Sequence, residues 1–132
     1  MELKEALLKR RSVRDFVDGD IADQLLDELM YAAMAGPSAM NSQPWEFYVV
    51  KNKNILKQLR ESGRHSNMNA GAAIVVTGNK KRFLLGREDF WIEDCSAATE
   101  NILLRACDLG LGTVWCGVYP VAANMENIKN IL

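Results

Sequence analysis

The sequence predicts an α+β fold in which helices cover a central sheet. Three observations predict it: several segments repeat apolar residues at helical spacing, short aromatic and β-branched runs lie between them, and the two kinds of segment do not alternate regularly. Regular alternation would have favoured a doubly wound parallel sheet. The 132 residues, 48% of them hydrophobic, fit a single domain spanning positions 1–132 with a core of its own.

Two helices are expected in the first quarter of the chain. The first ends near Arg10 and presents an apolar stripe of Leu3, Ala6, Leu7 and Leu8 among charged residues. The second covers about 22–35, where Asp20 can cap its start and the pair Gly36-Pro37 stops it.

The rest of the chain predicts three strands and three more helices. A loop continues to Pro44, and the aromatic and β-branched residues that follow predict a strand. Gly110 ends the longest helix. The expected strands cover 45–50, 72–77 and 113–119, and the expected helices cover 54–61, 89–109 and about 124–132.

Charge and cysteine content exclude several classes of function. The net charge of −1, from 16 basic and 17 acidic side chains, gives no general positive field for nucleic acid. No apolar run approaches the roughly 20 residues that cross a bilayer, and the N-terminus does not resemble a signal peptide, so we expect a cytoplasmic protein. Cys95, Cys107 and Cys116 are expected to be reduced thiols, and the single His65 leaves no metal site.

The segment Arg10-Arg11-Ser12-Val13-Arg14 is a candidate phosphate site. Guanidinium groups donate charge-assisted hydrogen bonds to phosphate oxygens, and a serine hydroxyl adds a neutral donor. A structural role is the plainer explanation of the first two arginines taken alone, because cations at the end of a helix oppose its dipole.

The loop at 36–44 is a candidate for recognising a flat heterocycle. Pro37 and Pro44 fix φ at both ends, and the polar side chains between them are Ser38, Asn41, Ser42 and Gln43. A preorganised set of donors and acceptors suits the edge of a heteroaromatic ring, since a mobile loop loses entropy on binding. A simple polar connection explains the same composition. Together with the arginine segment, the loop indicates a bound flavin nucleotide.

The glycines at 110–117 match neither of the common phosphate cradles, because they lack both the GxGxxG spacing and a following lysine. Gly110 and Gly112 are expected to serve as a helix cap and a tight entry to a strand. Gly117 lies inside the strand pattern, where the absence of a side chain lets a ligand approach the backbone.

Three stretches of the sequence resemble the nitroreductase family of FMN-dependent NAD(P)H oxidoreductases, particularly its short members. They are RRSVRDF at 10–16, PSAMNSQPW at 37–45 and DCSAATENILLRACDLGLGTVWCGVYP at 94–120. The resemblance extends over essentially the whole chain. It implies a three-layer domain with a central mixed or antiparallel sheet flanked by helices, and a homodimer that holds FMN at the subunit interface.

The resemblance also assigns roles to residues. Those implied to contact the phosphate and pyrimidine edge of FMN are Arg10, Arg11, Ser12 and Arg14. The loop implied to come from the other subunit is Pro37, Ser38, Ala39, Met40 and Asn41. The backbone amides of Cys116 and Gly117 are implied to approach flavin N5 and O4, and Trp91 is expected near the substrate pocket.

The implied activity is hydride transfer from NADH or NADPH to flavin N5, followed by reduction of a nitroaromatic, a quinone or an unsaturated carbonyl compound in ping-pong order. No catalytic side chain is expected, because the cofactor carries the chemistry. Family members usually continue past the position of Leu132 through a strand and a basic residue at the phosphate, so a shortened member is expected. The alternative is a non-catalytic FMN-binding or dimerisation module.

Overall fold

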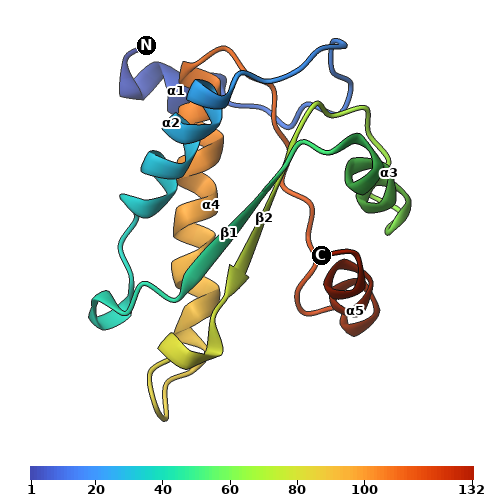
Figure 1. Ribbon diagram of the computed structural model, residues 1–132. Coiled ribbons are helices and arrows are strands. Elements are labelled where there is room, and N and C mark those ends of the chain that lie inside the picture. The colour runs from blue at the N-terminus through green and yellow to red at the C-terminus, as the bar shows by residue number, and fades with distance from the viewer.

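The computed structural model describes residues 1–132 and confirms an α+β fold with helices on both sides of a small sheet (Figure 1). The helices are α1 (Leu3–Lys9), α2 (Asp23–Met34), α3 (Lys53–Glu61), α4 (Phe90–Asp108) and α5 (Ala122–Ile131). The strands are β1 (Trp45–Val50) and β2 (Ala73–Gly78), and the 3₁₀ turns are η1 (Ala39–Asn41) and η2 (Lys80–Arg82).

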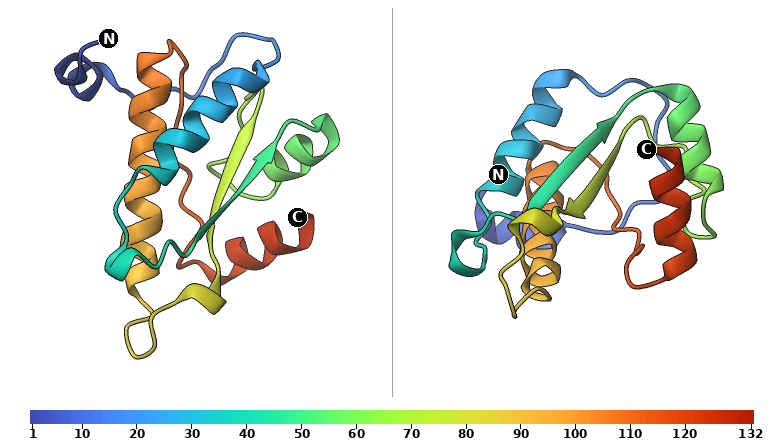
Figure 2. Two further views of the ribbon diagram at one scale, coloured as in Figure 1. Left: turned by 60° about the vertical axis from the view of Figure 1, so that its left-hand side comes forward. Right: turned by 60° about the horizontal axis from the view of Figure 1, so that its bottom comes forward.

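The two strands form the central layer. They pair antiparallel, with Trp45 opposite Gly78 and Val50 opposite Ala73. Helices α2 and α4 lie on one side of the pair, and α3 and α5 lie together on the other side (Figure 2). Helix α4 packs against both strands, whereas Tyr48 and Val49 of β1 remain exposed.

The core lies between α2, α4 and the start of β1. Ala33 of α2 and Ala98 and Ala106 of α4 are fully buried, and these small side chains let the two helices approach closely. The larger members of the same cluster are Leu26, Leu29, Trp45, Cys95 and Ile102. The helical stripe expected at 89–109 is therefore the main packing surface of the domain, and Gly110, with φ of +76°, ends that helix as predicted.

The third predicted strand is wrong. Residues 113–119 form no strand, and their single bridge is a parallel one between Thr113 and Ser12. A strand needs a partner along its length, and the arginine segment accompanies this stretch for only one residue pair. The aromatic and β-branched composition of 113–119 therefore produces an extended segment, not a third strand of the sheet.

Asp20 was expected to cap the second helix, and it does not. Helix α2 begins only at Asp23, its N-cap position is Ala22, and no side chain bonds its first N–H groups. Asp20 lies too far before the first turn to reach these donors. Helix α3 is capped instead as its sequence permits, since the Asn52 side chain accepts hydrogen bonds from the Asn54 and Ile55 amides.

All three cysteines are free thiols. No helix combines the length and hydropathy that crossing a bilayer requires. In α1 only Ala6 is buried, whereas Leu3, Leu7 and Leu8 are each more than half exposed. Of the apolar stripe predicted for the first helix, only Ala6 is therefore covered within the chain, and the three leucines stay exposed.

Candidate functional site

The arginine segment and the glycine-containing segment lie side by side. The Val13 amide donates to the Thr113 carbonyl at 2.8 Å, and Ser12 bridges Thr113. A Cβ on Gly112 would come within 3.0 Å of the Val13 side chain, so the glycine permits this close approach. Two parts of the predicted cofactor site, about 100 residues apart in the chain, thus meet.

The end of the arginine segment is fixed by a second anchor. The Asn69 side chain accepts from the Phe16 amide at 3.0 Å and donates to the Phe16 carbonyl at 2.6 Å. This double hydrogen bond acts like a strand pairing and holds the backbone just after Arg14. Asn69 belongs to none of the motifs in the sequence, and no local pattern marks it.

The arginines differ in availability. Arg11 folds back, and its Nη1 donates to the carbonyls of Leu8 and Arg10 at 2.7 and 2.8 Å, which is the helix-end role expected from the sequence. Arg10 lies 3.8 Å from the Glu100 carboxylate. Arg14 has no ion pair, and its charge acts on the Cys116 thiol. Arg14 is therefore the least engaged cation of the three.

The backbone at Cys116 and Gly117 is open to a ligand. Neither amide N–H has a hydrogen-bond acceptor within the chain. A Cβ placed on Gly117 would meet no atom within 4 Å, so the fold itself leaves this space clear. Unpaired backbone donors beside an uncommitted arginine are suited to an electron-rich, anionic ligand.

The Cys116 thiol is a poor candidate for covalent chemistry. Its Sγ lies 3.5 Å from the His65 carbonyl, to which it donates. Burial raises the pKa of this thiol, and the nearby Arg14 lowers it by a smaller amount. The thiol is therefore protonated at neutral pH, and protonated thiols are weak nucleophiles.

The proline-bracketed loop contains the 3₁₀ turn η1 and has an unusual backbone. Met40, Asn41 and Gln43 have φ of 53°, 52° and 46°, in the left-handed region that residues with a side chain seldom occupy. The Ser38 hydroxyl accepts from the Gln43 amide at 3.0 Å, which closes the turn. The loop thus has a defined turn that its own side chain closes, and its preorganisation for a ligand stays a prediction.

The loop does not meet the other predicted site residues within one chain. Its amide at Ala39 bonds to Asp94 near the start of α4, whereas Ser12 bridges Thr113, beyond the end of the same helix. Figure 1 shows η1 and α1 at opposite ends of α4. One chain therefore holds two halves of the predicted site that face different regions.

Trp91 belongs to an aromatic cluster. Its ring stacks on Phe83 with centroids 5.7 Å apart and meets the edge of Tyr119 at 4.9 Å. Gly78 leaves room for these rings, since a Cβ there would come within 2.8 Å of both Phe83 and Trp91. Tyr119 follows Gly117 by two residues, so the cluster connects Trp91 to the open backbone.

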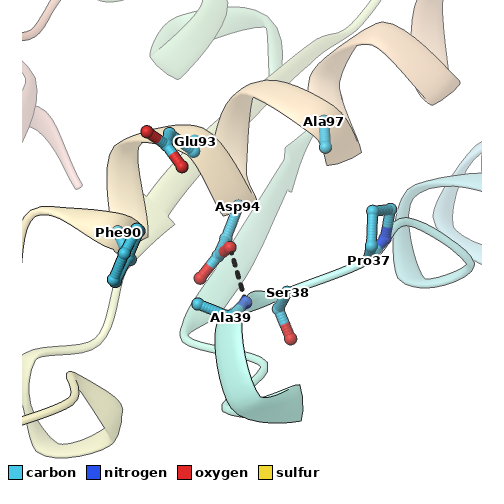
Figure 3. A pocket seen from close by; sticks show the side chains of 7 residues that line it. All are labelled: Pro37, Ser38, Ala39, Phe90, Glu93, Asp94 and Ala97. Atoms are coloured by element: carbon cyan, nitrogen blue, oxygen red, sulfur yellow. Dashed lines mark hydrogen bonds between the residues drawn. The ribbon is translucent and has the colours of Figure 1, made fainter.

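Asp94 is the functional candidate that sequence reasoning missed. It is the buried charged residue of the core, 5% exposed, and it lines a cavity of about 370 Å³ with Ala39 and Phe90 (Figure 3). A signal was available in the helical period, because positions 91, 94, 95 and 98 share one face and place an acidic residue on the apolar stripe.

Comparison with known proteins points to one family throughout. A family model described as "Nitroreductase family" matches residues 7–91. A relative from Archaeoglobus fulgidus named "Putative NADH dehydrogenase/NAD(P)H nitroreductase" is 44% identical over 99% of this chain and 76% of its own length.

Solved structures agree with the sequence comparison. One of the same name from Parabacteroides distasonis superposes with a TM-score of 0.91 at 35% identity, over 98% of this chain and 76% of that one. An FMN-dependent nitroreductase from Clostridium difficile gives a TM-score of 0.84 at 34% identity, over 97% and 76% of the two chains.

Proposed function

Because the chain belongs to the nitroreductase family, we propose that it is an FMN-dependent oxidoreductase that uses NADH or NADPH to reduce a nitroaromatic, a quinone or a similar acceptor. The observation that carries this proposal is the open backbone at Cys116 and Gly117 beside the uncommitted Arg14. FMN joins a phosphate to a ring that carries hydrogen-bond acceptors at N5 and O4, and these residues offer a cation and two unpaired N–H donors.

The residues present fit FMN in chemistry and in space. Ser12 makes no side-chain hydrogen bond within the chain, so its hydroxyl is available to a phosphate together with Arg14. Gly117 leaves room for a flat ring to approach the backbone. The aromatic cluster of Phe83, Trp91 and Tyr119 would form one wall of the adjoining substrate pocket.

When bound, FMN supplies the ability to accept a hydride from the nicotinamide and to pass reducing equivalents to the second substrate. The chain's own residues would orient FMN and polarise its ring. The amides of Cys116 and Gly117 donate to the ring and stabilise negative charge there, which is electrostatic catalysis by preorganised donors. Arg14 and Ser12 fix the phosphate and thereby the position of the ring. No side chain is assigned the role of acid or base.

We propose that two copies of the chain complete the site. Within one chain the loop at Pro37–Asn41 cannot reach the ligand held by Arg14, so a second copy would supply it. The exposed leucines of α1, namely Leu3, Leu7 and Leu8, offer an apolar surface that such a copy would cover. Residues 1–132 would then act as one FMN-binding domain in a cytoplasmic homodimer, where free cysteines stay reduced.

The purified protein is expected to be yellow, to behave as a dimer in native mass spectrometry, and to oxidise NADH or NADPH when a quinone or nitroaromatic is present. Initial rates measured at several concentrations of both substrates should give parallel double-reciprocal lines, the kinetic pattern of ping-pong order. Protein that binds FMN but oxidises neither nicotinamide would support the non-catalytic module instead. Colourless protein that cannot be reconstituted with FMN contradicts both.

Replacing Cys116 with alanine is expected to leave turnover nearly unchanged. The residue would serve through its backbone amide, which alanine retains, while its protonated thiol would take no part. Steady-state NAD(P)H oxidation by Cys116→Ala and by the parent protein tests this directly. Loss of turnover with FMN still bound would show that the thiol takes part in the reaction.

A further inference from the structure

The proposed function makes no use of Asp94, although its setting is unusual. It is the buried acidic residue of the fold, on the core face of α4 beside Cys95 and Ala98. Its Oδ2 is buried and accepts no hydrogen bond within the chain. A desolvated carboxylate oxygen without a donor is unfavourable, so retaining a carboxylate at this position requires an explanation.

The other oxygen explains the position. Oδ1 accepts the Ala39 amide at 2.9 Å, which joins α4 to the first residue of η1 across 55 positions of sequence (Figure 3). An ionised acceptor makes this bond about twice as strong as one between neutral groups. The bond is partly buried, and it lies at the edge of the open pocket that Pro37 and Phe90 also line.

The loop needs such an anchor because its backbone is strained. Met40 and Asn41 follow Ala39 directly, and both lie in the left-handed region. Two other contacts hold the far end of the loop: the Ser38 hydroxyl accepts the Gln43 amide, and Arg82 donates to the Gln43 carbonyl at 3.3 Å. The Asp94 contact is the one that ties the near end to a rigid helix.

We infer that Asp94 is a positioning residue for FMN: its Oδ1 holds the Ala39 amide and so fixes Met40 and Asn41 in the conformation that binds the partner's cofactor. This inference rests on the proposed function, in which the loop at 37–41 meets the flavin of the other subunit. Asp94 acts through the loop and is not itself a ligand of FMN. A free loop would lose conformational entropy on each binding event, and the anchor removes that cost in advance.

Two substitutions at Asp94 test the anchor. Asp94→Ala removes the acceptor and is expected to raise the Kd for FMN about 10- to 150-fold, the worth of a hydrogen bond to a charged group. Asp94→Asn keeps an acceptor oxygen for the Ala39 amide, so its Kd should rise less than about tenfold. The Kd values come from the quenching of FMN fluorescence on binding.

The other end of the bond allows a second test. Proline suits position 39, since it is the first residue of η1 and Ser38 before it is extended. Ala39→Pro removes the donor alone, and we expect a loss of FMN affinity like that of Asp94→Ala. The double variant should then be no worse than Asp94→Ala, because both changes remove one interaction. If the double variant instead loses FMN affinity by the product of the two single losses, the two residues act independently and the inference is overturned.

A control separates positioning from simple destabilisation. Ile102→Val trims a buried residue on the core face of the same helix and lowers thermal stability without touching the loop. If this variant, matched in melting temperature to Asp94→Ala, shows the same change in Kd for FMN, Asp94 is merely structural and the inference fails. An unchanged Kd in Asp94→Ala overturns it as well.

Amide hydrogen exchange in the FMN-free protein distinguishes a failure of the Asp94 anchor from a failure of the proposed FMN-dependent function. Asp94→Ala should speed exchange at the Ala39 amide at least about tenfold, while Ile102→Val should not affect it beyond its global stability effect. Parent protein that fails to bind FMN but shows a protected Ala39 amide overturns the flavin part of the inference together with the proposed function. An Ala39 amide that exchanges equally fast in the parent and in Asp94→Ala overturns the anchor itself.

Discussion

Gly117→Val is expected to weaken FMN binding by about 1–3 kcal/mol, the usual cost of overpacking, while the fold stays intact. The structure gives no reason of its own for a glycine here: an added Cβ meets no atom within 4 Å, and φ is not in the left-handed region. Valine also restricts the unfolded chain, so the thermal stability should not fall. The branched side chain would instead occupy the space that the proposed ring needs.

Titration of FMN against Gly117→Val and a matched glycine variant checks this prediction. Gly112→Val is the control, because a Cβ there would lie 3.0 Å from Val13 and should disturb the contact between the two segments. We expect Gly112→Val to lose stability and Gly117→Val to keep it while losing FMN. Parent-like FMN affinity in Gly117→Val would show that no ligand approaches this backbone.

Arg14→Ala is expected to weaken FMN binding by about 1.5–3 kcal/mol, or roughly 10- to 150-fold, since it removes a charge-assisted contact to the phosphate. Ser12→Ala should cost less, because its contact is neutral. Arg11→Ala offers a contrast. The Arg11 guanidinium caps the end of α1. Its removal should therefore mainly lower the melting temperature and have only a small effect on FMN affinity. Equal FMN affinity in Arg14→Ala and the parent protein would mean that the phosphate lies elsewhere.

Mixing two defective variants tests whether the site is shared. In the proposed dimer, Arg14→Ala damages the site through one subunit and Asn41→Ala through the other. A mixed dimer would then carry one doubly damaged site and one intact site, so random exchange of subunits should restore about a quarter of the sites by symmetry. No recovery of high-affinity FMN binding on mixing would contradict a site built from both copies.

Much of the fold was predictable because it depends on local patterns. The apolar period of 89–109 predicted α4, and Gly110 was correctly identified as its stop. The composition of 45–50 and 72–77 correctly indicated the two strands. The family resemblance, carried by three separated motifs, was confirmed by the comparisons. The roles of the individual site residues remain predictions.

The errors concern choices that neighbouring residues do not encode. Residues 113–119 have the composition of a strand, but strand formation depends on which segment pairs with them, and their one β-bridge is to Ser12. Asp20 is a good capping residue by type, but α2 begins three residues after it. In both cases the residue types suit the predicted element, but the contact that the element needs is absent: a neighbouring strand for 113–119 and the first N–H groups of α2 for Asp20.

By itself, the sequence determined the α+β class, the positions of the helices and the family, because helical period, capping glycines and motif spacing all act within short stretches of chain. Only the tertiary structure decided that Arg11 turns back on α1 while Arg14 stays free, that the amides of Cys116 and Gly117 lack acceptors, and that Asp94 holds Ala39. These contacts join residues brought together by packing of the core, and packing depends on the whole chain at once.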